Sequence, residues 1–99
     1  MTLSEPQKKY LRGRGHDLKP VITVGDAGLS ASLMAEYEST IAHHELIKVR
    51  VRAGDRSVRD AIIDELCASG SAELIQRVGN VALIYRENAD EKKIIIPKR

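Results

Sequence analysis

Aromatic and sulfur-containing residues are scarce in this sequence. Among its 99 residues there is no tryptophan and no phenylalanine, and there are only three tyrosines and one cysteine. A core drawn from this composition is expected to be aliphatic. The single cysteine, Cys67, excludes an internal disulfide and agrees with a reducing environment such as the cytoplasm.

Long apolar segments are absent as well. No hydrophobic run approaches the roughly 20 residues that are needed to span a bilayer, and the first residues are polar and basic, unlike a secretory signal peptide. We therefore expect a cytoplasmic protein without a membrane partner. The length, with 42% hydrophobic and 30% charged residues, predicts a single domain over 1–99, in which about 88–99 form a short C-terminal extension.

Residue patterns typical of enzymes are missing too. His43 and His44 are adjacent, and neighbours in a helix do not face the same way. One cysteine without spaced His or Asp pairs gives no metal site, and no Gly-Lys-Ser or Gly-Lys-Thr is present to bind a nucleoside triphosphate. Cys67 falls at the edge of an apolar helix stripe, where a thiol is usually inert. The sequence predicts a protein that is not an enzyme and that uses no cofactor and no metal.

Capping signals and apolar periodicity predict three helices, which begin after Ser4, Ser30 and Asp55 and cover about 5–14, 31–43 and 56–69. Apolar runs predict four strands, over about 21–24, 46–52, 74–78 and 81–86, the last two joined by a tight turn at 79–80. Where the second helix meets the second strand, His44 is expected near the helix dipole and Glu45 is expected to face solvent.

The predicted order is α-β-α-β-α-β-β. Each strand–helix–strand crossover is expected to join parallel neighbours, and the final hairpin adds an antiparallel pair. This order predicts an α/β fold, a two-layer sandwich with a mixed four-stranded sheet. The apolar triplet 94–96 is expected to add a short strand or to pack on an edge.

A four-residue loop, Gly25-Asp26-Ala27-Gly28, separates the first predicted strand from the second predicted helix. Glycine lacks a Cβ, so the backbone of a ligand can approach the main chain closely, and the helix N-terminus that follows favours negative charge. Two glycines three residues apart usually mark only a turn. Their place between strand and helix favours an anion cradle, and Lys19, just upstream, is expected to reach a phosphate near the loop.

Basic residues are clustered, although the net charge is only +2. Five lie between 8 and 19 against the single acid Asp17, none lies between 20 and 47, and a second cluster begins at 48. The clusters are Lys8, Lys9, Arg12, Arg14 and Lys19, and then Lys48, Arg50 and Arg52, followed by Arg56 and Arg59. Such patches attract a polyanion, but charges of this kind can equally serve solubility.

The basic residues of the second cluster alternate with Ile47, Val49 and Val51. This period of two predicts a strand with one face in the core and one basic face. Arg77 and Arg86 are expected to extend the basic patch if the final hairpin lies nearby.

The segments LKPVITVGDAGLS (18–30) and HHELIKVRVR (43–52) resemble the CRM domain (chloroplast RNA splicing and ribosome maturation), most closely its small stand-alone bacterial YhbY-type members. The resemblance extends from Leu3 to Arg86. It implies a fold like the C-terminal domain of translation initiation factor 3, and RNA binding through the glycine loop and the adjacent basic surface. Bacterial members of the family are associated with precursors of the large ribosomal subunit.

Asp26 departs from a loop interior that suits phosphate. Its carboxylate would repel a phosphate over the loop unless it caps the following helix, and this shifts the expected contacts toward Arg12, Arg14, Lys19 and the basic strand face. We therefore expect a monomeric RNA-binding protein that acts on large-subunit ribosomal RNA. Few aromatic side chains are available for stacking, so little sequence preference is expected. The alternative is a protein-interaction adaptor on the ribosome that uses an acidic helix face with Glu36 and Glu38.

Overall fold

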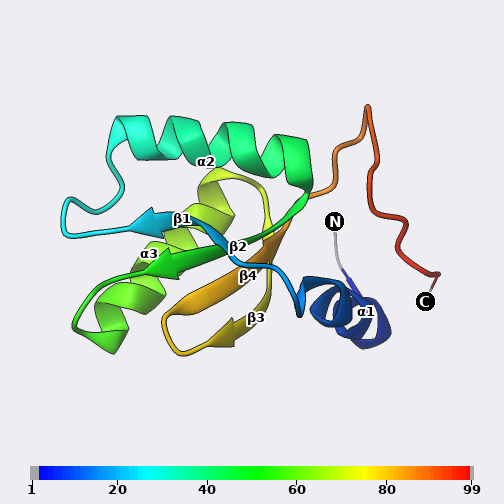
Figure 1. The fold of residues 1–99 in the computed structure, drawn as a ribbon, viewed down its shortest axis with the longest axis horizontal. Coiled ribbons are helices and arrows are strands. Elements are labelled where there is room, and N and C mark those ends of the chain that lie inside the picture. Colours follow the sequence, from blue (N-terminus) through cyan, green and yellow to red (C-terminus); the bar gives the residue numbers. More distant parts are fainter. Residues whose placement is uncertain (1–2, 99) are drawn as a thin grey trace.

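The computed structural model describes residues 3–98. Three helices and four strands follow one another in the predicted order, and the predicted bounds agree with the observed ones to within a residue (Figure 1). The elements are α1 (Glu5–Gly15), β1 (Pro20–Val24), α2 (Ala31–His44), β2 (Leu46–Val51), α3 (Arg56–Ser69), β3 (Glu73–Val78) and β4 (Val81–Tyr85). The predicted α/β fold with a mixed four-stranded sheet is confirmed.

Local hydrogen bonds determine where the helices begin. Gln7 N–H donates to Ser4 Oγ (3.3 Å), and Ser4 N–H donates to Gln7 Oε1 (2.9 Å), which completes a capping box for α1. Ser30 Oγ accepts from Leu33 N–H (3.2 Å), and Asp55 caps α3 with its carboxylate. Each cap satisfies a backbone N–H that has no partner within the helix. All three predicted N-caps are therefore confirmed.

The second crossover differs from the expectation. β1 and β2 are parallel neighbours as predicted, but β4 lies between β2 and β3 and pairs antiparallel with both. The composition of β4 accounts for this position, because its residues 82–85 are all buried. A strand with apolar side chains on both faces is stable in the middle of a sheet and would be exposed at an edge.

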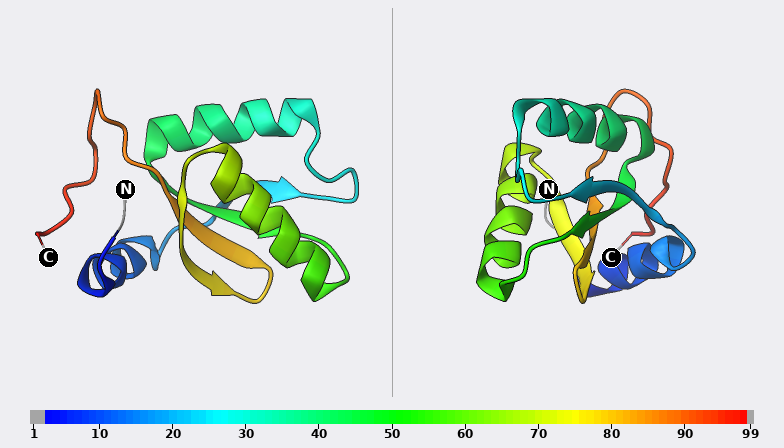
Figure 2. Two further views of the ribbon diagram at one scale, coloured as in Figure 1. Left: turned by 180° about the vertical axis from the view of Figure 1, so that it is seen from behind. Right: turned by 60° about the vertical axis from the view of Figure 1, so that its left-hand side comes forward.

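The two faces of the sheet are covered unequally (Figure 2). Helices α2 and α3 pack on one face and enclose the main core, to which Ala82 and Ile84 of β4 contribute. On the other face, α1 packs against one end of the sheet and encloses a smaller core with Leu83 and Tyr85. The sheet with α2 and α3 is the predicted two-layer sandwich, and α1 adds partial cover on the opposite side.

The core is not purely aliphatic, and that expectation was wrong for two of the three tyrosines. Tyr37 and Tyr85 are among the largest fully buried side chains. The Tyr37 hydroxyl donates to the Leu66 carbonyl (2.9 Å), so its polar atom is satisfied inside the core. Burial raises the pKa of Tyr37 well above its usual value of 10, and both tyrosines stay neutral at physiological pH.

Glu45 does not face solvent, and the sequence expectation for it was wrong. Its side chain is fully buried, and its backbone has a φ of 65° at the end of α2. The carboxylate accepts backbone N–H groups from Asn88 (2.7 Å), Lys93 (2.7 Å) and Ile94 (2.8 Å). Three donors compensate the cost of burying the charge and attach the segment that follows β4 to the end of α2.

The segment after β4 forms no strand within its described residues, 86–98. It returns over the side of the molecule toward α1 (Figure 1). Ile94 is buried in the smaller core, Ile96 packs partly against it, and Gln7 Nε2 donates to the Pro97 carbonyl (3.1 Å). The apolar triplet therefore adds no strand, and Ile94 packs in the smaller core with α1 rather than on an edge, while Ile95 is exposed.

Candidate nucleic-acid interface

The glycine loop is an open turn between β1 and α2. Gly28 N–H donates to the Gly25 carbonyl (3.0 Å), and Gly28 has a φ of 69°, in the left-handed region that glycine adopts without strain. No side-chain or backbone atom lies within 4 Å of the position that a Cβ would take on Gly25 or Gly28. The main chain is therefore open to a ligand at both glycines.

Asp26 has no capping role in this loop. Ser30 supplies the N-cap of α2, and Asp26 and Ala27 are exposed beside it. The carboxylate of Asp26 therefore faces solvent at the loop and repels anions there. This supports the expectation that cations outside the loop must supply most of the attraction.

The loop lies at one end of the molecule and α1 at the other, along its longest dimension of 39 Å (Figure 1). Lys19 precedes β1 and Gly25 follows it, so that about 20 Å of extended chain separates them at roughly 3.3 Å per residue. The structure therefore does not bring Lys19 close to the loop, and the expected shared phosphate contact is not possible. Lys19 belongs instead to the end of the sheet that carries α1.

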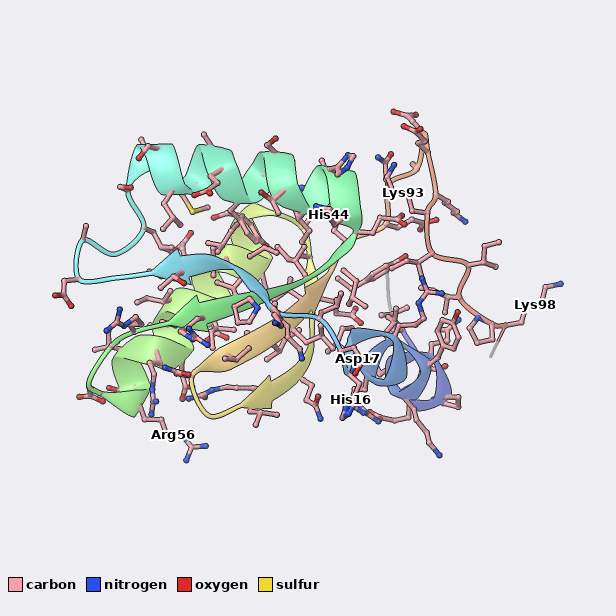
Figure 3. All side chains as sticks on the ribbon, in the orientation of Figure 1. His16, Asp17, His44, Arg56, Lys93 and Lys98 are labelled. Carbon is pink, nitrogen blue, oxygen red and sulfur yellow. The ribbon has the colours of Figure 1, made fainter. Side chains whose placement is uncertain are left out.

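Arginines of the second cluster are the cations near the loop. The backbone N–H of Arg52 donates to the Val24 carbonyl (2.8 Å), one residue before the loop begins. Leu29, just after the loop, shares a hollow of about 410 Å³ with Val58 of α3. The first turn of α3 is thus beside the loop, and Arg56 lies at this end of the molecule (Figure 3).

Arg56 and Arg59 were noted in the sequence as part of a basic run but were not predicted as site residues. Together with Arg77 they line a second hollow of about 310 Å³. The sequence signal that could have identified them is their spacing of three residues, which places both on one side of a helix that begins just after the basic strand.

A groove of about 480 Å³ occupies the part of the sheet face that α1 leaves open. Three predicted site residues line it: Lys19, Lys48 and Arg50. Lys48 Nζ donates to the carbonyl of His16, at the end of α1 (3.4 Å), so this cation is held at the junction between helix and sheet. The structure thus brings Lys19, which precedes β1, together with Lys48 and Arg50 of β2, although the sequence could not place these cations relative to one another.

The remaining predicted cations lie on α1. Lys9 and Arg14 are exposed, and Lys8 and Arg12 are half-buried. Arg14 Nη1 donates to the Tyr10 hydroxyl (3.4 Å). Among residues 3–98, no carboxylate lies within ion-pair distance of the eight predicted cations, which are Lys8, Lys9, Arg12, Arg14, Lys19, Lys48, Arg50 and Arg52.

Arg77 and Arg86, which were expected to extend the basic patch if the hairpin lay nearby, are both paired with acids. Arg77 is paired with Asp60. Arg86 forms a two-pronged ion pair with Glu38 (2.5 and 2.9 Å) and donates to the Gly70 carbonyl (3.1 Å). The Arg86 hydrogen bonds hold the pKa of Glu38 below its usual range. One of the two acids of the alternative adaptor face, Glu38, is therefore already paired with an arginine of the same chain at the surface.

Two features of the described residues bear on metal and thiol chemistry. Within 3–98, no group of three His, Cys, Asp or Glu side chains could hold a metal ion. Burial raises the pKa of the Cys67 thiol to about 11, so the reactive thiolate is scarce at neutral pH. None of the helices in this part of the chain has the length and apolar character required to cross a membrane.

Comparison with known proteins decides the family. The family model for the CRS1/YhbY (CRM) domain matches residues 3–86, nearly the whole chain. The chain belongs to the CRM domain family. The matched residues include α1, the glycine loop and the whole sheet. The segment that Glu45 attaches to the end of α2 lies beyond them.

Similar proteins are known from Pseudomonas aeruginosa and Haemophilus influenzae. A Pseudomonas aeruginosa protein named as a probable RNA-binding protein is 43% identical over 94% of this chain and 89% of its own length. An RNA-binding protein of Haemophilus influenzae is 39% identical over 99% of this chain and 98% of its own.

A CRM-like structure is known from Staphylococcus aureus. The solution structure of that protein, a candidate for RNA binding, superimposes with a TM-score of 0.81. It is 30% identical and covers 97% of this chain and 100% of its own. Its similarity confirms the arrangement of helices and strands described above.

Proposed function

We propose that this protein binds RNA without catalysing a reaction on it, mainly through the phosphate backbone. The proposal is carried by one observation: eight cations without acidic partners among the described residues extend from α1, through the groove, to the end of β2 beside the glycine loop. Cations in this arrangement release counterions from a polyphosphate when it binds. The RNA-binding names of the CRM relatives support the same conclusion.

The RNA that we propose is ribosomal RNA in precursors of the large subunit, bound by a monomer. The family resemblance supports this choice. The structure contributes a physical requirement: the target must be long enough to contact cations at both ends of a 39 Å molecule. A folded ribosomal RNA offers phosphates over such a distance, whereas a small anion does not.

The test is to remove charge from α1. In Arg12→Ala with Arg14→Ala, two cations disappear from a helix that other residues hold in place, so the fold should persist. We expect the affinity for large-subunit ribosomal RNA fragments to fall by a similar factor whatever the sequence of the fragment. The slope of log affinity against log salt should become less steep by about 0.7 per lost contact with a single strand. Filter binding or fluorescence anisotropy across a salt series measures both quantities.

The matched control places the same change of net charge elsewhere. Ala35→Glu with Ser39→Glu also lowers the net charge by two, on the exposed side of α2. Binding that falls equally in both double variants would mean that only overall charge matters and would contradict a defined interface. If the α2 variant alone disrupted attachment to ribosomal particles, the adaptor alternative with Glu36 and Glu38 would be correct instead.

A further inference from the structure

The groove beside α1 has an apolar floor that phosphate binding alone does not require. Strand pairing places its residues in two rows across the sheet. One row joins Lys48 of β2, Leu83 of β4 and Gln76 of β3, and the next joins Arg50, Val81 and Val78. Side chains that are directly opposite in neighbouring strands point to the same face. Each row therefore begins with a cation and continues into an apolar or amide side chain.

A shift in strand register makes this arrangement possible. The pairing of β3 with β4 shifts between Leu74 and Gln76, as at a β-bulge, and leaves Ile75 without a paired partner. Ile75 turns into the smaller core, and Gln76 lines the groove opposite Leu83. Bulges of this kind redirect side chains and occur frequently at functional sites.

Two apolar side chains of the groove are exposed to solvent. Val78 is 65% exposed and Leu18, at the other rim, is 39% exposed. If the cations served only to keep the protein in solution, a solvated basic surface would be enough. Such a surface has no need of an apolar floor. The floor and the cations together fit a ligand that is apolar and flat on one part and anionic on another.

The geometry points to this groove as a binding site for one unpaired nucleotide of the RNA. The base lies on Val78 and Val81, and the adjoining phosphates face Lys48 and Arg50 of β2 and Lys19, which precedes β1. The Gln76 amide, which can both donate and accept, faces the edge of the base. This inference rests on the proposed function and adds the class of RNA that the site takes.

The dimensions favour a single-stranded ligand. A volume of about 480 Å³ lies within the range of about 300–1,000 Å³ that is typical of small-ligand sites. In a double helix the base faces are stacked and cannot reach an apolar floor, whereas loops and bulges of RNA present unpaired bases. An acidic peptide with apolar side chains is the other ligand class, but the Gln76 amide beside the apolar floor suits the edge of a base.

The first variant removes the floor without changing the charge. Val78→Ser alters an exposed side chain at the end of the edge strand β3, so the fold should be retained. We expect affinity for an unpaired oligonucleotide, hexauridylate or hexaadenylate, to fall about five- to tenfold with an unchanged salt slope. Affinity for a fully paired RNA duplex should not change. Ile95→Ser is the matched control, because Ile95 is 81% exposed and lies outside the groove.

The second variant removes charge without removing the floor. Lys48→Met keeps the long apolar stem, and we expect it to lower the salt slope by about 0.7 for the same oligonucleotides. Amide chemical shifts of the wild-type protein, followed during titration with hexauridylate, should move at Gln76, Val78 and Val81.

The outcomes separate the two proposals. RNA that binds the wild type with no shifts in the groove, or equally well to Val78→Ser, would overturn the nucleotide site and leave the proposed function intact. Failure of ribosomal RNA fragments to bind at low salt would overturn both. An acidic peptide that moves the groove signals at lower concentration than hexauridylate would also overturn the nucleotide assignment.

Discussion

At the scale of single residues, burial decides chemistry that the sequence leaves open. Glu45 and Glu38 are both glutamates of the α2 region, yet one is fully buried among backbone N–H groups and the other is paired with Arg86 at the surface. Cys67 is packed against the main core, and its thiol is shielded from water. These surroundings determine how each residue affects stability.

Glu45→Gln replaces a carboxylate oxygen with an NH₂ group that cannot accept a hydrogen bond. At least one of the three backbone N–H groups is then left without a partner, so we expect the free energy of unfolding to fall by about 2 kcal/mol. Urea denaturation followed by circular dichroism measures this loss. Glu91→Gln is the control, since Glu91 is exposed. Equal stability of both variants would show that the buried hydrogen bonds contribute nothing net.

The Cys67 thiol predicts a loss of stability in alkaline solution. Burial raises its pKa from 9.0 to about 11, so between these values the unfolded chain loses a proton that the folded chain keeps. The unfolded state binds fewer protons there, and the free energy of unfolding falls as pH rises from about 9 to about 11. In Cys67→Ala this decline should begin only near pH 10, where the buried tyrosines start to contribute. Denaturation curves at half-unit pH steps test it, and identical profiles would refute the assignment.

At the scale of elements, the glycine loop combines two glycines with different requirements. Gly28 has a positive φ, so any other residue there is strained by about 1–2 kcal/mol. Gly25 has no such requirement and has open space where a Cβ would lie. Gly25 is therefore the position at which a larger residue can test ligand binding without straining the fold.

Gly25→Val should fold with nearly unchanged stability and should weaken RNA binding several-fold, because the added methyl groups keep the RNA backbone away from the main chain. Anisotropy titration with a ribosomal RNA fragment measures the effect, and thermal unfolding verifies the fold. Ala68→Val adds comparable bulk at an exposed position of α3 and should leave binding unchanged. Undiminished binding by a folded Gly25→Val protein would exclude the loop from the interface.

At the scale of the whole molecule, the segment after β4 connects the smaller core to the basic helix. Ile94 packs beneath α1 with Leu11, and Gln7 donates to the Pro97 carbonyl. The position of the α1 cations therefore depends on residues more than 80 positions away in the sequence. Stability and binding are coupled through this contact.

Ile94→Ala should lower the free energy of unfolding by about 2–4 kcal/mol, because it leaves a cavity in the smaller core. It should also weaken RNA binding, since α1 is no longer held firmly against the sheet. The neighbouring Ile95→Ala changes an exposed side chain and should cost less than about 0.5 kcal/mol. Denaturation and RNA titration of the two variants side by side give the answer, and equal effects would contradict the packing role of Ile94.

The sequence by itself determined the elements, because their signals are local. Serine and aspartate caps, a period of two in 46–52 and a two-residue turn at 79–80 each depend on neighbours within a few positions. The basic clusters and the glycine loop were also visible in the sequence, and so was the family resemblance. The burial of Glu45 was not, because its three hydrogen-bond donors lie more than 40 residues further along the chain.

Only the tertiary structure decided which of these features are neighbours. It placed β4 between β2 and β3 and shifted the register so that Gln76 lines the groove. Each of these depends on how strands with two apolar faces pack, and no local pattern encodes that choice. The groove exists because α1 covers only one end of the sheet face opposite α2 and α3.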